Sequence, residues 1–394
     1  MRETRAARAS AFAKASADRS EPEGASLHRR AAARKERMAA QLSTAEHNST
    51  TSCAVLPVAL DAMGGDRAPE ATVAGAVTAA RELSIPVLLV GDETRLMAEL
   101  GRHPRVPSGI EVVHAGDVIG MEESPGQALL RKRDSSVMVA ANLVKEGRAS
   151  AVVSAGNSGA VMGAALLRLG MLPGVDRPAI ASLFPTRRGK AVVLDVGATV
   201  DATPEQLVAF ARIGERYARC MLHLERPRVG LLSIGAEPSK GNAVIKKTFP
   251  LLEASGLNFV GNVEGGDVAQ GSVEVVVCDG FTGNVLLKVV EGYVEFVWEV
   301  LKEALCSGWR SRLGAWLAKP ALLGMASRFD YAAYGGALLL GVNGVVVIAH
   351  GRSSPEAVAS ALRVARDLAE QRVVEELAVW FRRPPKADSE RGER

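Results

Sequence analysis

Short apolar runs, each followed by a turn rich in Gly, Asp and Asn, recur along this chain. The first run covers residues 55–60 and leads into DAMGGD, after which Pro69 suits the first position of a helix. A second run covers 151–154, leads into AGNSG and precedes an expected helix over 160–169. Each segment therefore predicts a buried strand, a polar turn and a helix. The apolar face expected for the first helix is Val73, Ala76, Val77 and Ala80.

The same order of strand, turn and helix is found four more times. Residues 191–194 precede DVGATVD and a capping-box pattern, Thr203 to Gln206, and three later apolar runs end in GAEPSKGN, CDGFTGN and HGRSSPE. Strands that alternate with helices are typical of βαβ units. The chain is therefore predicted to adopt an α/β fold with a largely parallel sheet flanked by helices.

These six turns also suggest where a ligand binds. In open parallel sheets ligands bind beyond the carboxyl ends of the strands, and we expect all six turns at one such edge. Glycines let a ligand approach the backbone, and helix amino termini favour anions. Any single turn is explained by turn geometry alone. Because the six turns also hold Lys240, Lys288 and His350, together they favour an anion-binding site.

Several common sites are excluded by their missing motifs. The first strand is not followed by GxGxxG, no GxxxxGK[ST] is present, and AGNSG lacks the spacing of a nucleophile elbow. The four cysteines are scattered without CxxC or neighbouring histidines, which indicates a reducing compartment. We therefore expect no cofactor and no metal.

Composition and charge limit the remaining classes. With 394 residues, 47% hydrophobic and 4% aromatic, the chain can bury a core of small aliphatic side chains in one large or two smaller domains. Residues 1–52 hold ten Lys/Arg and six Asp/Glu, which accounts for the whole net charge of +4, so no nucleic-acid surface is expected. We predict a disordered extension over 1–52, an enzyme domain over 53–380 and a polar tail over 381–394. No apolar run is long enough to cross a bilayer.

Seven segments in order resemble the phosphate acyltransferases of bacterial phospholipid synthesis (PlsX), from about residue 55 to about 376. They are DAMGGD, SAGNSG, LDVGATVD, KGN, NVEGGD, VVCDGFTGNVLLK and YGGALLLGVNGVVVIAHG. The resemblance implies a fold similar to isocitrate and isopropylmalate dehydrogenases and to phosphotransacetylases. It implies that acyl-[acyl carrier protein] and phosphate give acyl phosphate and free carrier, and that the product passes to a membrane glycerol-3-phosphate acyltransferase. It also implies a cytoplasmic homodimer bound peripherally to the inner face of the cell membrane. Five positions depart from the family pattern: Arg67, Ser158, Thr199, and Ala236 and Pro238 in a loop that is often acidic in the family.

The implied reaction needs a bound anion, a stabilised oxyanion and a thiolate leaving group, and phosphate itself is the nucleophile. Phosphate is expected on the backbone of DAMGGD and AGNSG, with side-chain donors in the second turn. The predicted binding residues are Asp61, Gly64, Gly65, Asp66, Gly156, Asn157, Ser158, Asp195 and Asp279, the aspartates orienting nearby cations. The predicted catalytic residues are Lys240 and Lys288 for charge, Asn242 and Asn284 for the oxyanion, and His350 for the thiolate. A helix-capping or core histidine and an exposed lysine are the plainer alternatives for His350 and Lys288.

Residues 298–329 form a predicted protruding amphipathic helical hairpin. The segment holds three of the four tryptophans, and five basic residues and one acid lie between Lys302 and Arg328, which favours contact with anionic lipid. Gly308, Gly314 and Pro320 are expected to break it into short helices. A dimer contact or a lid is the alternative. The acidic carrier protein is expected to dock on this hairpin or on Arg131–Arg133.

Other functions stay open on the sequence alone. One is a short-chain phosphotransacetylase that uses acyl-coenzyme A, and another is a dehydrogenase of the related fold, for which the dinucleotide motif is missing. A non-catalytic membrane-surface module is the alternative outside the enzymes.

Overall fold

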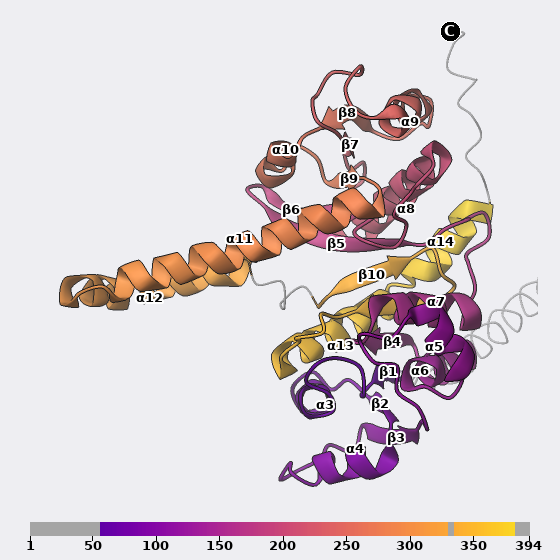
Figure 1. The fold of residues 1–394 in the computed structure, drawn as a ribbon, viewed down its shortest axis with the longest axis vertical. Helices are drawn as coiled ribbons and strands as arrows, with labels where there is room; N and C mark the ends of the chain where they lie inside the picture. Colours follow the sequence, from indigo (N-terminus) through magenta and orange to yellow (C-terminus); the bar gives the residue numbers. More distant parts are fainter. Residues whose placement is uncertain (1–55, 330–334, 383–394) are drawn as a thin grey trace, which may run out of the picture. The chain divides into compact units, whose positions relative to one another are not determined.

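An eleven-stranded sheet in the order β3-β2-β1-β4-β11-β10-β5-β6-β9-β7-β8 organises the described part of the chain (Figure 1). The structure, a computed structural model, describes residues 56–329 and 335–382. The predicted extension over 1–52 lies outside the described residues. The described residues from Leu56 onward belong to one compact unit.

The strands have these bounds: β1 (Val58–Asp61), β2 (Val87–Gly91), β3 (Ile110–His114), β4 (Ala151–Ser154), β5 (Ala179–Thr186), β6 (Gly189–Leu194), β7 (Val229–Leu232), β8 (Phe259–Val263), β9 (Val275–Val277), β10 (Ala337–Leu340) and β11 (Val345–Ile348). The helices are α3 (Glu70–Glu82), α4 (Glu93–Leu100), α5 (Pro125–Arg131), α6 (Ser136–Lys145), α7 (Ser158–Arg168), α8 (Pro204–Leu222), α9 (Ala243–Glu253), α10 (Gly265–Gln270), α11 (Gly280–Cys306), α12 (Trp309–Phe329), α13 (Pro355–Glu370) and α14 (Val373–Arg382). The predicted α/β fold is confirmed, because seven of the ten strand pairings are parallel.

Local sequence signals explain where these elements begin. Helix α8 starts at the predicted capping box: the Gln206 amide donates to Thr203 Oγ1 at 3.3 Å, and the Thr203 amide donates to Gln206 Oε1 at 3.0 Å. The strand predicted over 151–154 is β4 itself. Alternate residues of a strand point to opposite faces. Accordingly Val153 packs in one core cluster with α3 and α13, and Val152 packs in the other with α6 and α7.

The prediction that all six polar turns share one edge of the sheet is wrong. Strand β10 is antiparallel to both β11 and β5, and β5 is antiparallel to β6. Three reversals between β11 and β6 make β6, β9 and β7 run opposite to β1, β4 and β11. The turns after β1, β4 and β11 therefore lie at one edge, and the turns after β6, β7 and β9 lie at the other.

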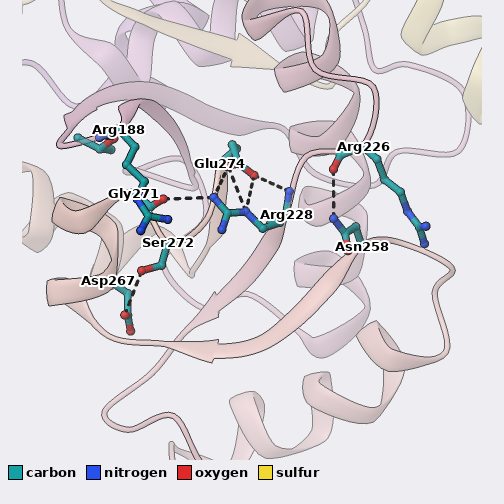
Figure 2. A network of polar contacts seen from close by, with 9 residues as sticks. Arg188, Arg226, Arg228, Asn258, Asp267, Gly271, Ser272 and Glu274 are labelled. Carbon is teal, nitrogen blue, oxygen red and sulfur yellow. Dashed lines mark hydrogen bonds and ion pairs between the residues drawn. The ribbon is translucent and has the colours of Figure 1, made fainter.

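A polar cluster fastens the start of β7 beside the start of β9 (Figure 2). Arg228 Nη2 donates to Glu274 Oε1 at 2.5 Å and to the Gly271 carbonyl at 3.2 Å, and the Arg228 amide donates to Glu274 Oε2 at 2.7 Å. Burial alone would raise the pKa of Glu274, but the hydrogen bonds and charge of Arg228 outweigh it and hold that pKa below its ordinary value. These hydrogen bonds therefore hold β7 next to its parallel neighbour β9.

Helices α11 and α12 form the predicted hairpin but are longer and more regular than predicted (Figure 1). The first arm starts at Gly280 rather than at residue 298, and α12 continues through Gly314 and Pro320. A proline inside a helix destabilises it by about 3 kcal/mol and a glycine by about 1 kcal/mol. Helix α12 tolerates both because it is long and packs against α11. The glycine and proline positions therefore do not divide α12 into short pieces.

The carboxyl-terminal boundary also differs from the prediction. Helix α14 ends at Arg382, and Phe381 packs against the core and against the Trp380 ring, with ring centroids 4.9 Å apart. Residues 381 and 382 are thus helical rather than part of a polar tail. The predicted tail over 383–394 lies outside the described residues.

Candidate active site

Three turns meet at the carboxyl ends of β1, β4 and β11, and two glycines allow this approach. A Cβ on Gly64 would lie 2.8 Å from the Gly156 amide nitrogen, so a side chain there would separate the first two turns. Gly65 has a φ of +107°, and a Cβ on it would lie 3.1 Å from the Gly351 carbonyl oxygen. The Asp66 amide donates to that same carbonyl at 2.8 Å. The double glycine thus joins three turns into one surface.

Asp61 is part of the support beneath this surface. It is 3% exposed; its Oδ2 accepts a hydrogen bond from Ser154 Oγ at 2.7 Å and its Oδ1 accepts one from the Met63 amide at 3.3 Å. Burial raises the pKa of the carboxyl, although these hydrogen bonds oppose the shift. The sequence predicted that Asp61 orients a cation. Its hydrogen-bond partners are instead a hydroxyl and an amide.

Asn157 fixes a neighbouring loop. Its Oδ1 accepts from the Ala160 amide at 3.2 Å and caps α7, and its Nδ2 donates to the carbonyls of Met121 and Glu123 at 3.0 Å each. Both amide hydrogens are therefore already used, which contradicts the prediction that this side chain donates to phosphate. Lys132 holds the same loop, because its Nζ donates to the Val118 carbonyl at 2.7 Å and pairs with Glu123 Oε1 at 2.5 Å.

The turn surface presents groups that suit an anion. Ser158 begins α7, and the first amides of any helix have no partner within that helix. His350 lies on the turn after β11, at the same edge of the sheet, and its Nδ1 accepts from the Arg352 amide at 3.2 Å. The neutral His350 ring therefore carries its proton on Nε2. Ser158, His350 and Arg352 all line the same cavity.

At the other edge of the sheet, Asp195 organises the turn after β6. The side chain is fully buried; Oδ1 accepts from the amides of Ile180, Gly197 and Ala198 at 2.9–3.1 Å, and Oδ2 accepts from the Thr199 amide at 2.6 Å. Burial raises the pKa of this carboxyl despite the four amide donors. Its bonds are to the backbone and not to a cation, so Asp195 shapes the turn.

Helix α11 starts in close contact with that turn. The Gly280 amide donates to the Thr199 carbonyl at 2.8 Å, and a Cβ on Gly283 would lie only 1.9 Å from the Asp195 carbonyl oxygen. Asp279 caps the helix, accepting from the Thr282 amide and hydroxyl at 2.8 Å each. Glycine at 280 and 283 therefore sets how closely α11 approaches the sheet.

A cavity of about 500 Å³ lies between α11 and strand β5 and reaches both edges. Its polar lining comes from turns at both ends and from one face of α11: Asp66, Ser158, Asn284, Lys288, His350 and Arg352. Its apolar lining comes from the sheet and from α11: Ile180, Phe184, Val196, Leu287, Val290 and Ile348. A mostly apolar space with a few convergent polar groups is typical of a small-molecule site.

The cavity gathers only part of the predicted site. Six predicted residues line it: Asp66, Gly156, Ser158, Asn284, Lys288 and His350. Lys288 pairs with Glu291 Oε2 at 2.8 Å, so its charge is balanced locally. Lys240 and Asn242 do not line it, and Asn242 instead caps α9 by accepting from the Ile245 amide at 2.9 Å. The other predicted residues do not line the cavity: Asp61, Gly64, Gly65, Asn157, Asp195 and Asp279.

Some lining groups were not predicted from the sequence. Arg352 follows His350 within the HGRSSPE turn. Its position just after a predicted strand is the sequence signal that could have identified it as a lining residue. Met121 belongs to a loop without a motif, and the floor residues Ile180 and Phe184 belong to β5, for which no strand was predicted. Cys278 is buried, and burial raises its pKa well above the ordinary value, so it makes a poor nucleophile.

The described residues hold neither a cluster of metal-binding side chains nor a membrane-spanning helix. No group of three or more His, Cys, Asp or Glu side chains in residues 56–329 and 335–382 is placed to hold a metal ion. Within the same residues no helix is both long and apolar enough to cross a membrane.

Comparison with known proteins identifies the family. The family model described as "Fatty acid synthesis protein" matches residues 56–376. The chain belongs to this family. The phosphate acyltransferase of Pelotomaculum thermopropionicum is 48% identical over 322 residues, which cover 82% of this chain and 94% of the relative. That of Geobacter sp. strain M21 is 52% identical over 312 residues, which cover 79% and 89%. The resemblance seen in the sequence motifs is thus confirmed.

Solved structures agree on the fold. A phosphotransacetylase from Streptococcus pyogenes superposes with a TM-score of 0.52 at 17% identity and covers 81% of this chain and 94% of that chain. The EutD phosphotransacetylase from Staphylococcus aureus gives a TM-score of 0.50 at 17% identity, covering 80% and 94%. At this identity the likeness shows a shared fold, and the motif resemblance implied the same fold.

Proposed function

We propose that this protein transfers a fatty acyl group from a thioester to inorganic phosphate and releases an acyl phosphate. The observation that carries this proposal is the cavity between α11 and β5, which joins an anion-suited turn surface to an apolar floor. Phosphate and a fatty acyl chain need these two environments side by side. The names of the relatives and the fatty acid synthesis family support the same reaction.

The turn surface accounts for the steps of the reaction. Phosphate binds at the amino terminus of α7, on the amide and hydroxyl of Ser158, with His350 and Arg352 beside it. A phosphate oxygen forms a bond to the thioester carbonyl carbon, and the carbon–sulfur bond then breaks as the thiolate leaves. The Nε2–H of His350 donates a hydrogen bond to the departing sulfur, and the thiolate takes its proton from the hydroxyl that the attacking dihydrogen phosphate no longer needs. Gly156 brings its backbone to the cavity without a side chain in the way.

The acyl donor is the thioester of acyl carrier protein, and the acyl phosphate serves a membrane glycerol-3-phosphate acyltransferase. Both statements rest on the motif resemblance. A short-chain acyl-coenzyme A is the competing donor, and the apolar floor favours a long chain over an acetyl group.

We expect wild-type protein to lose thioester only when phosphate is present, with acyl phosphate as the product. His350→Gln is expected to lower kcat about 100-fold, because the leaving thiolate loses the hydrogen bond from the imidazole Nε2–H. The matched control is His114→Gln, an exposed histidine at the end of β3 that does not line the cavity. Rates are followed by thiol release at varied phosphate. Thioester loss without phosphate would refute acyl transfer to phosphate, and equal effects of the two variants would refute the place given to His350.

We also propose that the hairpin rests on the anionic inner surface of the cell membrane. Five exposed apolar side chains of α12 fall on one helix face at positions 309, 313, 316, 317 and 323, whereas Ser311, Ala315 and Leu322 on the opposite face are partly covered. Basic residues Arg310, Arg312 and Lys319 lie on the same helix. An apolar stripe with neighbouring positive charge suits peripheral binding to acidic lipid.

The double variant Trp309→Ser and Trp316→Ser is expected to lose at least about tenfold in vesicle binding. Flotation with phosphatidylglycerol vesicles measures this, and phosphatidylcholine vesicles show the charge dependence. Ile234→Ser is the control, because Ile234 is 82% exposed but lies on the turn after β7. Unchanged flotation of the double variant would remove the hairpin from the membrane contact.

A homodimer is the proposed assembly, supported by the resemblance and by exposed apolar side chains on α11 such as Phe281, 64% exposed. Light scattering at micromolar concentration tests it, and a monomer mass would exclude it.

A further inference from the structure

We infer that the acyl chain runs from the His350 end of the cavity beneath α11 toward the Asn284 end, and that Val290 limits its length. This inference rests on the proposed function and deepens it by assigning the specificity-determining residue. Three observations carry it: the distance between the two ends, their different charge, and the spacing of the α11 residues that line the cavity.

The sheet register sets the length of the cavity. Val347 of β11, Leu338 of β10, Ala181 of β5 and Leu194 of β6 lie side by side in one row. His350 follows Val347 by three residues in one direction, and Gly197 follows Leu194 by three residues in the other. At about 3.3 Å per residue the ends are separated by on the order of 20 Å along the strands. A cavity of about 500 Å³ spread over this length is a narrow channel.

Helix α11 forms one wall along most of this length. Its lining residues recur at helical spacing from Asn284 through Leu287, Val290 and Val294 to Glu295. At about 1.5 Å per residue they span on the order of 16 Å, in agreement with the register. Asn284 marks the Gly197 end, because a Cβ on Gly197 would lie 3.8 Å from Asn284 Oδ1. Val290 is therefore near the middle of the channel.

The two ends differ in charge, which orients the substrate. The His350 end has the amino terminus of α7 and His350, and the guanidinium of Arg352 there offsets the carboxylate of Asp66. The Asn284 end is backed by the carboxylates of Asp195 and Asp279 on adjoining turns. Two negative groups there disfavour a phosphate. Phosphate and the thioester therefore belong at the His350 end, and the chain extends the other way.

The middle of the channel suits an alkyl chain. On the floor of the channel, strand β5 supplies Ile180 and Phe184, with Ser182 between them. On the opposite wall, α11 supplies Leu287 and Val290. The Lys288 and Glu291 side chains form an ion pair at 2.8 Å and so bring no net charge to the wall. Burying the chain against these side chains stabilises the complex in proportion to the apolar area removed from water, so a longer chain binds more tightly.

The test compares Val290→Phe with Val297→Phe, the same change one heptad further along α11. Val297 is 54% exposed and does not line the cavity. Acyl phosphate formation is measured with octanoyl and hexadecanoyl thioesters of acyl carrier protein. Val290→Phe is expected to lower kcat/KM for the hexadecanoyl donor at least about tenfold and to change it little for the octanoyl donor. Val297→Phe is expected to leave both unchanged.

Binding of an unreactive hexadecyl thioether of phosphopantetheine, measured by calorimetry, keeps the test independent of turnover. If Val290→Phe weakens this binding but not that of the octyl thioether, the channel is supported even without catalysis. If wild-type protein binds the thioether but forms no acyl phosphate, the proposed function fails and the channel stands. If both chain lengths respond equally to Val290→Phe, the channel assignment is overturned.

Discussion

Replacing Gly283 by Ala is expected to lower the free energy of unfolding by about 3 kcal/mol and to reduce acyl transfer in the remaining folded protein. The added methyl would lie 1.9 Å from the Asp195 carbonyl oxygen and 2.9 Å from Cys278 Sγ, so α11 must move away from the sheet. That movement also displaces Asn284, Leu287 and Val290, which line the cavity. Chemical denaturation and hexadecanoyl transfer kinetics measure the two effects.

Gly292 provides a control within the same helix. A Cβ at this position meets no atom within 4 Å, and Ala is the better helix former by about 1 kcal/mol. Gly292→Ala is therefore expected to raise stability slightly and to leave transfer unchanged. Equal destabilisation by the two variants would mean that helix propensity, and not the contact with Asp195, decides the effect.

Sequence alone predicted the local units of this fold well. The capping box at Thr203, strand β4 and the helix after DAMGGD follow from neighbouring residues, because capping, periodicity and turn chemistry act over a few positions. Strand direction across the sheet depends on partners far away in the chain. Nothing within the six turns shows that β5 and β10 reverse the sheet, and so the turns were placed at one edge.

The same limit applies to the site. DAMGGD and AGNSG were correctly associated, yet their glycines were expected to make room for phosphate. In the structure a Cβ on Gly64 would meet the Gly156 backbone, and the glycines serve contact between turns. Asn157 was expected to bind phosphate, but its amide holds the carbonyls of Met121 and Glu123. The types of residue pointed to turns that meet in the structure, whereas the hydrogen-bond partners of each residue depend on tertiary structure.

Asp195→Asn is expected to destabilise the protein by about 2–3 kcal/mol, although the side chain keeps its size. The carboxylate accepts four backbone amides, three through Oδ1 and one, from Thr199, through Oδ2. An amide side chain has one acceptor oxygen, so its NH₂ group must face a donor. Leaving a buried donor without a partner costs about 1–3 kcal/mol, and the side chain is fully buried. Differential scanning calorimetry measures the loss.

The variant also separates a structural role for Asp195 from a role in binding substrate. Because the carboxylate shapes the turn that carries Gly197 and supports the start of α11, its loss is expected to weaken hexadecyl thioether binding while the KM for phosphate stays close to wild type. Asp201→Asn is the control, since Asp201 is exposed six residues further along the same turn. A large rise in the KM for phosphate with unchanged stability would instead place Asp195 at the anion. It would also move the chemistry to the Asn284 end of the channel, reversing the direction of the acyl chain inferred above.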